Sequence, residues 1–71
     1  MNKNNVLYEI KDAMDIEQDI LLSDNLDSFE EWDSLAMLSI LSFFHDNSIN
    51  IEVEDIEQCN TIGDIVKLAT K

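Results

Sequence analysis

The sequence predicts a small all-α protein: a bundle of four helices, with a long loop between the first and second helices and a short third helix. The chain of 71 residues contains no proline and a single glycine, Gly63, so the usual residues of β turns are nearly absent. Apolar residues recur at three- and four-residue steps in separate segments, which is typical of amphipathic helices. The length allows one domain, residues 1–71, with a small core.

The first helix is predicted near the start of the chain, with Asn4 or Asn5 as its N-cap. Its apolar face consists of Val6, Leu7, Ile10, Ala13 and Met14. The segment from Asp15 to Asp33 has no clean period and mixes isolated apolar residues with acids. A structureless loop of this length is unusual in a compact domain. We therefore expect a loop that is pinned against the helices and includes a turn of helix.

The middle helix is predicted to start at Asp33 and Ser34, both good capping residues, and to end near Asp46 or Asn47. At 100° per residue, one wide apolar arc contains Ala36, Met37, Leu38, Ile40, Leu41, Phe43 and Phe44. The narrower polar side contains Ser39, Ser42 and Asp46, with Leu35 among them. An arc this wide indicates a helix that packs on several neighbours or leaves an apolar strip for a partner.

The last third of the chain predicts three short elements. Ile51 and Val53 alternate with acids and indicate a short extended piece, and Glu54 to Cys59 fits one or two helical turns. Thr61-Ile62-Gly63-Asp64 resembles a capping box with a shorter acid, which predicts the start of the last helix. The face of that helix is formed by Ile62, Ile65, Val66 and Ala69.

The charge of the chain restricts its partners. Sixteen acidic residues and four lysines give a formal charge of −12, so the chain cannot neutralise the phosphates of a nucleic acid or an anionic membrane surface. The most apolar stretch, Leu35 to Phe44, is too short to cross a bilayer, and no signal-peptide segment follows the first residues. We expect a cytoplasmic monomer whose partners present basic surfaces.

Catalysis by the chain itself is not expected. His45 is the only histidine and Cys59 the only cysteine, and a surface histidine with a buried structural cysteine explains them better than a nucleophilic pair. One cysteine excludes an internal disulfide and a cysteine-based zinc site, and Asp24 to Asp27 lacks the glycine and the spacing of a calcium loop. The sequence therefore predicts no catalytic residues and no dedicated metal site.

The tetrapeptide Trp32-Asp33-Ser34-Leu35 is open to two interpretations. Ser34 alone fits an N-cap, which needs no further explanation. A serine at a helix start that follows an acidic exposed loop also presents its hydroxyl to solvent. A phosphate on that oxygen would lie at the positive end of the helix dipole, near unpaired amide groups.

The chain resembles the acyl carrier protein family in three stretches that occur in order. Asn25 to Leu35 is similar to the family's loop that enters the second helix, where Asp-Ser-Leu carries the modified serine. Ile49 to Asp55 is similar to the stretch after that helix, and Thr61 to Ile65 to the start of the last helix. The resemblance implies a four-helix bundle of the acyl carrier protein type. It also implies a non-catalytic carrier that holds acyl or aminoacyl thioesters on a 4′-phosphopantetheine arm attached to Ser34.

The same resemblance implies the partners. These are a phosphopantetheinyl transferase, an acyl- or aminoacyl-activating ligase and an acyltransferase, which would dock on Asp33, Leu35, Ala36, Met37 and Ser39. Where fatty-acid carriers have glycine and a small residue before Asp-Ser-Leu, this chain has Glu31 and Trp32.

The outward positions of the second helix, taken as Ala36, Ser39 and Ser42, lack the carboxylates typical of the family. These departures favour a dedicated carrier of one pathway. The aromatic residues and Met37 are interpreted as core, which favours a short or polar cargo. The alternative function is an acidic interaction or inhibitor protein that docks on a basic enzyme surface without a prosthetic group.

Overall fold

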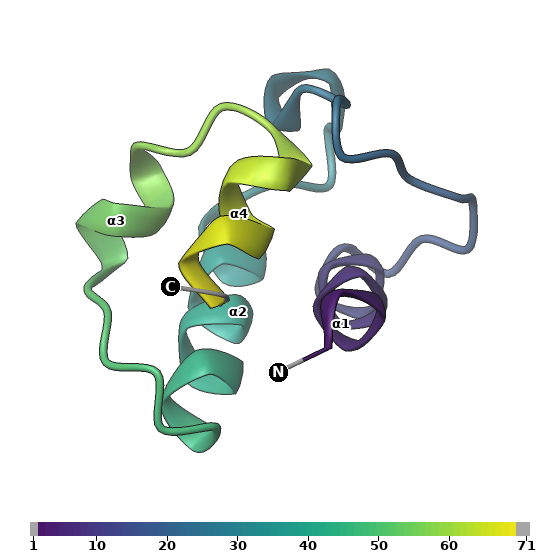
Figure 1. The fold of residues 1–71 in the computed structure, drawn as a ribbon. Helices are drawn as coiled ribbons and strands as arrows, with labels where there is room; N and C mark the ends of the chain where they lie inside the picture. Colours follow the sequence, from purple (N-terminus) through teal and green to yellow (C-terminus); the bar gives the residue numbers. More distant parts are fainter. Residues whose placement is uncertain (1, 70–71) are drawn as a thin grey trace.

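The computed structural model describes residues 2–69, which form four α-helices and one short 3-10 turn (Figure 1). In chain order these are α1 (Lys3–Met14), η1 (Leu26–Ser28), α2 (Ser34–Asp46), α3 (Val53–Glu57) and α4 (Ile62–Ala69). Helix α1 packs against α2 and α4, and α3 packs against α2. The prediction of a mostly helical bundle with a long first loop and a short third helix is confirmed. None of these helices is long and apolar enough to cross a membrane.

The core lies where the apolar faces of the helices meet. In α1 the buried side chains follow a four-residue step, and in α2 they all lie within the predicted arc and also follow a four-residue step. Each helix thus buries one apolar stripe. Removing apolar surface from water stabilises the fold by about 25 cal/mol for each Å² that is buried. The most deeply buried side chains are Val6, Ile10, Leu26, Ile40, Phe44, Ile56, Ile62 and Ile65.

The N-cap of α1 lies two or three residues earlier than predicted. The side chain of Asn2 accepts a hydrogen bond from the amide of Asn4 at 2.7 Å, so Asn2 is the N-cap and the prediction of Asn4 or Asn5 is wrong. The three asparagines are chemically equivalent as caps. The helix extends back to Lys3 and leaves Asn4 and Asn5 inside its first turn.

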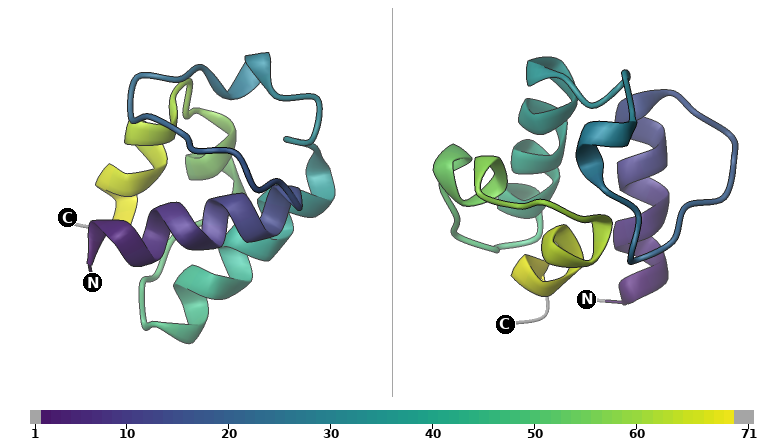
Figure 2. Two further views of the ribbon diagram at one scale, coloured as in Figure 1. Left: turned by 90° about the vertical axis from the view of Figure 1, so that its right-hand side faces the viewer. Right: turned by 90° about the horizontal axis from the view of Figure 1, so that it is seen from above.

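The loop of residues 15–33 is pinned to the start of α4, as predicted. Amides of Ile62 and Gly63 donate to the carbonyl oxygens of Asp24 and Leu22 at 3.0 and 2.8 Å, and the amide of Leu26 donates to Asn60 at 2.9 Å. The loop therefore supplies acceptors to the free amides of the first turn of α4. Both views in Figure 2 show the loop passing over one end of the bundle beside α4. The predicted helical turn within it is η1.

Gly63 is explained by this close approach. A Cβ atom at residue 63 would lie 3.0 Å from the carbonyl oxygen of Leu22, the same oxygen that accepts the Gly63 amide. A larger residue would push the loop away from α4 and break that hydrogen bond. The single glycine of the chain thus lies inside a helix, where it gives the loop room, and its dihedral angle φ is not positive.

The capping box of α4 is confirmed. The amide of Asp64 donates to Thr61 Oγ1 at 3.2 Å, and Asp64 Oδ2 accepts the amides of Asn60 and Thr61 at 3.0 and 3.2 Å. The hydrogen bonds from these two backbone amides stabilise the carboxylate and lower the pKa of Asp64 from its ordinary value of 3.8.

The predicted extended piece around Ile51 and Val53 is only partly correct. Ile51 and Glu52 are non-helical, but Val53 is the first residue of α3. The amide of Glu52 donates to Asp55 Oδ2 at 2.9 Å, and Ile56 is fully buried in the core. These contacts favour a helical turn from Val53 onward, while no neighbouring strand in the described part of the chain offers a ladder to Ile51.

Candidate functional site at the start of α2

Asp33 is the N-cap of α2. Its Oδ1 accepts a hydrogen bond from the amide of Ala36 at 3.0 Å, and its carbonyl oxygen accepts the amide of Met37 at 3.0 Å. Asp33 has extended backbone angles, as an N-cap residue does, and Ser34 is the first residue with helical geometry. The interpretation of Ser34 as the cap is therefore wrong, because the neighbouring carboxylate fulfils that role.

The side chain of Ser34 has no structural task within residues 2–69. It is exposed, and no hydrogen bond to its hydroxyl is present. The amides of Ser34 and Leu35 precede the helical hydrogen-bond ladder, so they add positive partial charge beside the hydroxyl. A helix start of this kind favours an anion attached to or bound near residue 34.

Two leucines lie exposed next to Ser34. Leu35 is 75% exposed and Leu38 is 53% exposed. Leu38 lies four residues after Ser34, so the two side chains share one face of α2. Ser39 is also exposed. The wide apolar arc of α2 thus ends in a strip that the bundle does not cover, which is one of the two outcomes expected of such an arc.

The predicted docking residues are only partly accessible. Ala36 is 1% exposed and belongs to the core, so the prediction that it faces outward is wrong. Ala36 lies four residues before the buried Ile40, so both side chains are on the same face of α2 and point into the core. Met37 is half-buried and packs against the core. Asp33, Leu35 and Ser39 are exposed, as docking requires.

The large side chains around this site belong to the core, as predicted. Phe44 is completely buried, and Trp32, Met37 and Phe43 are half-buried against the same cluster. The rings of Phe43 and Phe44 lie 5.7 Å apart between centroids in a tilted arrangement. Trp32 therefore anchors the end of the loop just before the Asp33 cap, and this fixes the position at which α2 begins.

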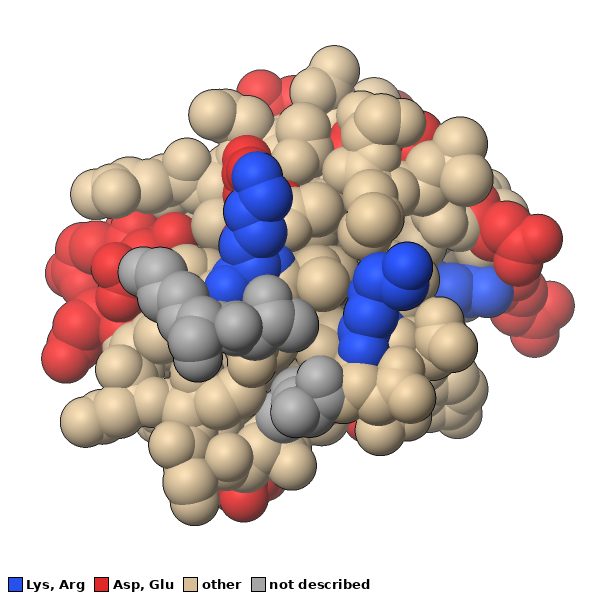
Figure 3. All heavy atoms as spheres, in the orientation of Figure 1, with Lys and Arg blue, Asp and Glu red and all other residues tan. Residues whose placement is uncertain are grey.

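Acidic residues surround the bundle, but α2 carries none between its Asp33 cap and Asp46, its last residue. The face drawn in Figure 3 shows acidic side chains gathered over α3 and over the loop after α1, with lysines between them. In α3 and the residue before it the acids are Glu52, Glu54, Asp55 and Glu57. The site at Ser34 thus combines neutral and apolar contacts with a surface whose charge is strongly negative.

Cys59 and His45 interact with different backbone groups and not with each other. Cys59 Sγ donates to the carbonyl oxygen of Asp55 at 3.4 Å, while His45 Nε2 lies 2.9 Å from the carbonyl oxygen of Ile51. Partial burial, together with the charges of Asp64 and Asp55, raises the pKa of the Cys59 thiol from 9.0 to about 11. The thiol is therefore protonated at neutral pH and is a poor nucleophile.

No group of three or more histidine, cysteine, aspartate or glutamate side chains in residues 2–69 is arranged to hold a metal ion. Comparison with protein-family models, with curated proteins and with solved structures finds no match for this chain. The description of the site therefore depends on the geometry of α2 and of the loop before it.

Proposed function

We propose that the protein is a carrier in which Ser34 is the attachment point of a 4′-phosphopantetheine arm that holds acyl or aminoacyl groups as thioesters. The observation that carries the proposal is the state of Ser34: it is exposed at the start of α2, and Asp33 has taken over the capping role. A serine that neither caps nor packs is free to be modified without loss of the fold. The resemblance to acyl carrier proteins supplies the identity of the modification.

The residues of the chain fit such a group. The Ser34 oxygen is accessible to a transferase, and the free amides of the first turn of α2 lie beside the phosphate that would be attached there. In the modification, Ser34 Oγ would form a bond to the phosphate of coenzyme A that bears the pantetheine. The bond from that phosphate to the rest of the nucleotide would break, and the transferase would accept the serine proton. The arm supplies a terminal thiol for thioesters.

The chain itself presents the cargo and performs no turnover. Asp33 holds the start of α2 in place, while Leu35 and Leu38 offer apolar contact to an enzyme that approaches Ser34. The outward Ser39 and Ser42 carry no charge and the acid of α2 is Asp46 at its far end, so long-range steering must come mainly from acids outside α2. This distribution favours partners that serve one dedicated pathway.

Intact mass measurement tests the proposal. The wild type and Ser34→Ala are incubated with coenzyme A and a phosphopantetheinyl transferase of broad specificity. We expect the wild type to gain the mass of one phosphopantetheine group and Ser34→Ala to gain none. Ser42→Ala removes another exposed serine of the same helix and is expected to be modified like the wild type.

The formal charge of −12 also favours the alternative of an acidic protein that blocks a basic enzyme surface. That function needs no particular serine at a helix start. An unmodified wild type, with a transferase shown to be active on a known carrier, would contradict the carrier proposal and favour this alternative.

A further inference from the structure

Tyr8 is a large side chain that the fold does not use. It lies in the middle of α1 and is 68% exposed, and no hydrogen bond to its hydroxyl is present in residues 2–69. Tyrosine has a lower helix propensity than alanine or glutamate, so the residue is not explained by the stability of α1. Large aromatic residues with a polar tip are enriched where one protein contacts another.

Two hollows lie on either side of Tyr8 and share it as a wall. One has a volume of about 340 Å³ and is also lined by Lys11, Asp12, Asp15, Ile16 and Glu17. The other has a volume of about 250 Å³ and is also lined by Asn5, Glu9, Phe43 and Asn47, so it extends from α1 to the end of α2. Tyr8 is therefore a ridge between two depressions, a shape that fits side chains of a partner on both sides.

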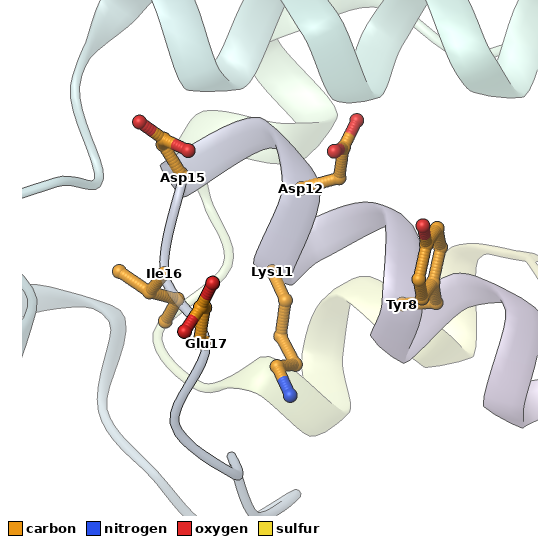
Figure 4. A pocket seen from close by; sticks show the side chains of 6 residues that line it. All are labelled: Tyr8, Lys11, Asp12, Asp15, Ile16 and Glu17. Carbon is orange, nitrogen blue, oxygen red and sulfur yellow. The ribbon is translucent and has the colours of Figure 1, made fainter.

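The charges of the larger hollow identify the chemistry of that partner. Figure 4 shows Tyr8, Asp12 and Asp15 pointing to one side of α1, while Lys11 points away to the other side. Lys11 Nζ lies 3.8 Å from Asp19 Oδ1, so its charge is partly neutralised. The side of α1 that bears the tyrosine ring thus presents two carboxylates, while Lys11, which also lines the hollow, extends to the other side of the helix and lies near Asp19.

We propose that this surface, formed by Tyr8, Asp12 and Asp15, binds an arginine-bearing segment of another protein. A guanidinium group stacks on the face of an aromatic ring and donates several hydrogen bonds to carboxylates at the same time. A second copy of the chain is not the occupant, because the chain contains no arginine and two copies of charge −12 repel each other. The proposal stands on α1 and is independent of the function of Ser34.

Titration of the full-length, unmodified protein with a synthetic peptide tests the proposal. The probe is an unstructured peptide rich in arginine, and a lysine peptide of equal length and charge is the control. We expect the arginine peptide to bind more tightly and to shift amide resonances mainly in residues 5–17 and 43–47. Tyr8→Ala should lower the affinity for the arginine peptide by about two- to fivefold. It should change the affinity for the lysine peptide by no more than about twofold.

Matched variants separate the site from general attraction to a negative protein. Tyr8→Phe keeps the ring and should retain the affinity, as should Leu21→Ala, which removes an exposed apolar side chain of the first loop without changing the charge. Asp12→Asn and Asp46→Asn each remove one exposed carboxylate, but only Asp12 lines the hollow. Asp12→Asn should therefore lower the affinity for the arginine peptide more than Asp46→Asn does. Equal binding by Tyr8→Ala and the wild type, or shifts centred on α3, would overturn the proposal.

Discussion

Ser48 has a left-handed backbone conformation, with φ of 63°, where the chain leaves α2. Its amide donates to the carbonyl oxygen of His45 at 3.0 Å, and the amide of Ile49 donates to Phe44 at 2.8 Å. This pair of hydrogen bonds ends a helix and favours glycine at the left-handed position, because a Cβ atom is crowded there. Ser48 adopts this conformation despite the local cost, and so does Asp15 with φ of 56° after α1.

We predict that Ser48→Gly raises the free energy of unfolding by about 0.5–1 kcal/mol, because relief of the left-handed strain exceeds the added flexibility of the unfolded chain. Urea unfolding followed by circular dichroism measures the change. Ser42→Gly is the matched control, since it introduces the same residue on the exposed side of α2. It should lower the stability by about 0.5 kcal/mol, the difference in helix propensity between serine and glycine. Destabilisation by both changes alike would show that residue 48 is not strained.

At the scale of the elements, the start of α2 separates structural from functional residues. Asp33 and Ser34 are adjacent and both exposed, yet only Asp33 is bonded to an amide of the helix. The exposed hydroxyl of Ser34 is therefore available for chemistry at little cost to the fold.

We predict that Asp33→Ala lowers the free energy of unfolding by about 1 kcal/mol, because the amide of Ala36 loses its acceptor. Ser34→Ala should change it by less than about 0.5 kcal/mol. Thermal or urea unfolding of both variants checks the difference. If Ser34→Ala proved as destabilising as Asp33→Ala, the serine would have a structural role and the carrier proposal would lose its main support.

The junction between the first loop and α4 is the second element-scale feature. Three backbone hydrogen bonds join residues 22–26 to residues 60–63, and a single isolated bridge pairs Asn25 with Thr61. The loop is thereby held in place at its centre, and Trp32 packs near its end against the core. The position of Ser34 thus depends on contacts formed far away in the sequence, as well as on its own helix.

At the scale of the whole molecule, negative charge opposes the compact state. The described part of the chain measures 27 × 23 × 18 Å, while the screening length is about 30 Å at 0.01 M salt and about 3 Å at 1 M. At low ionic strength, therefore, carboxylates on opposite sides of the molecule still repel each other. The unfolded chain separates these charges and is favoured accordingly.

We predict that the melting temperature rises by about 4–8 °C between 0.01 M and 0.5 M sodium chloride, which corresponds to roughly 1 kcal/mol in a domain of this size. Differential scanning calorimetry measures the shift. The double variant Glu54→Gln/Glu57→Gln removes two exposed charges of α3 and should show a smaller salt dependence. A melting temperature indifferent to salt would show that self-repulsion does not govern the stability.

The helices and their buried faces follow from the spacing of apolar residues along the chain. The spacing of Ile40 and Phe44 predicts which side of α2 is buried, because a helix of 3.6 residues per turn brings such positions together. The capping box of Thr61 and Asp64 was equally predictable, since both partners lie within one turn of helix.

Which of several equivalent residues takes each local role depends instead on packing between segments that are distant in the sequence. Asn2, Asn4 and Asn5 are equivalent capping residues, as are Asp33 and Ser34 to a close approximation, so the choice depends on where packing of the core sets the end of the helix. The same holds for Gly63. A side chain is disfavoured at this position because the carbonyl oxygen of Leu22, 41 residues earlier in the chain, lies too close. Contacts between distant segments leave no periodic signal in the sequence, and for that reason they had to be seen in the folded molecule.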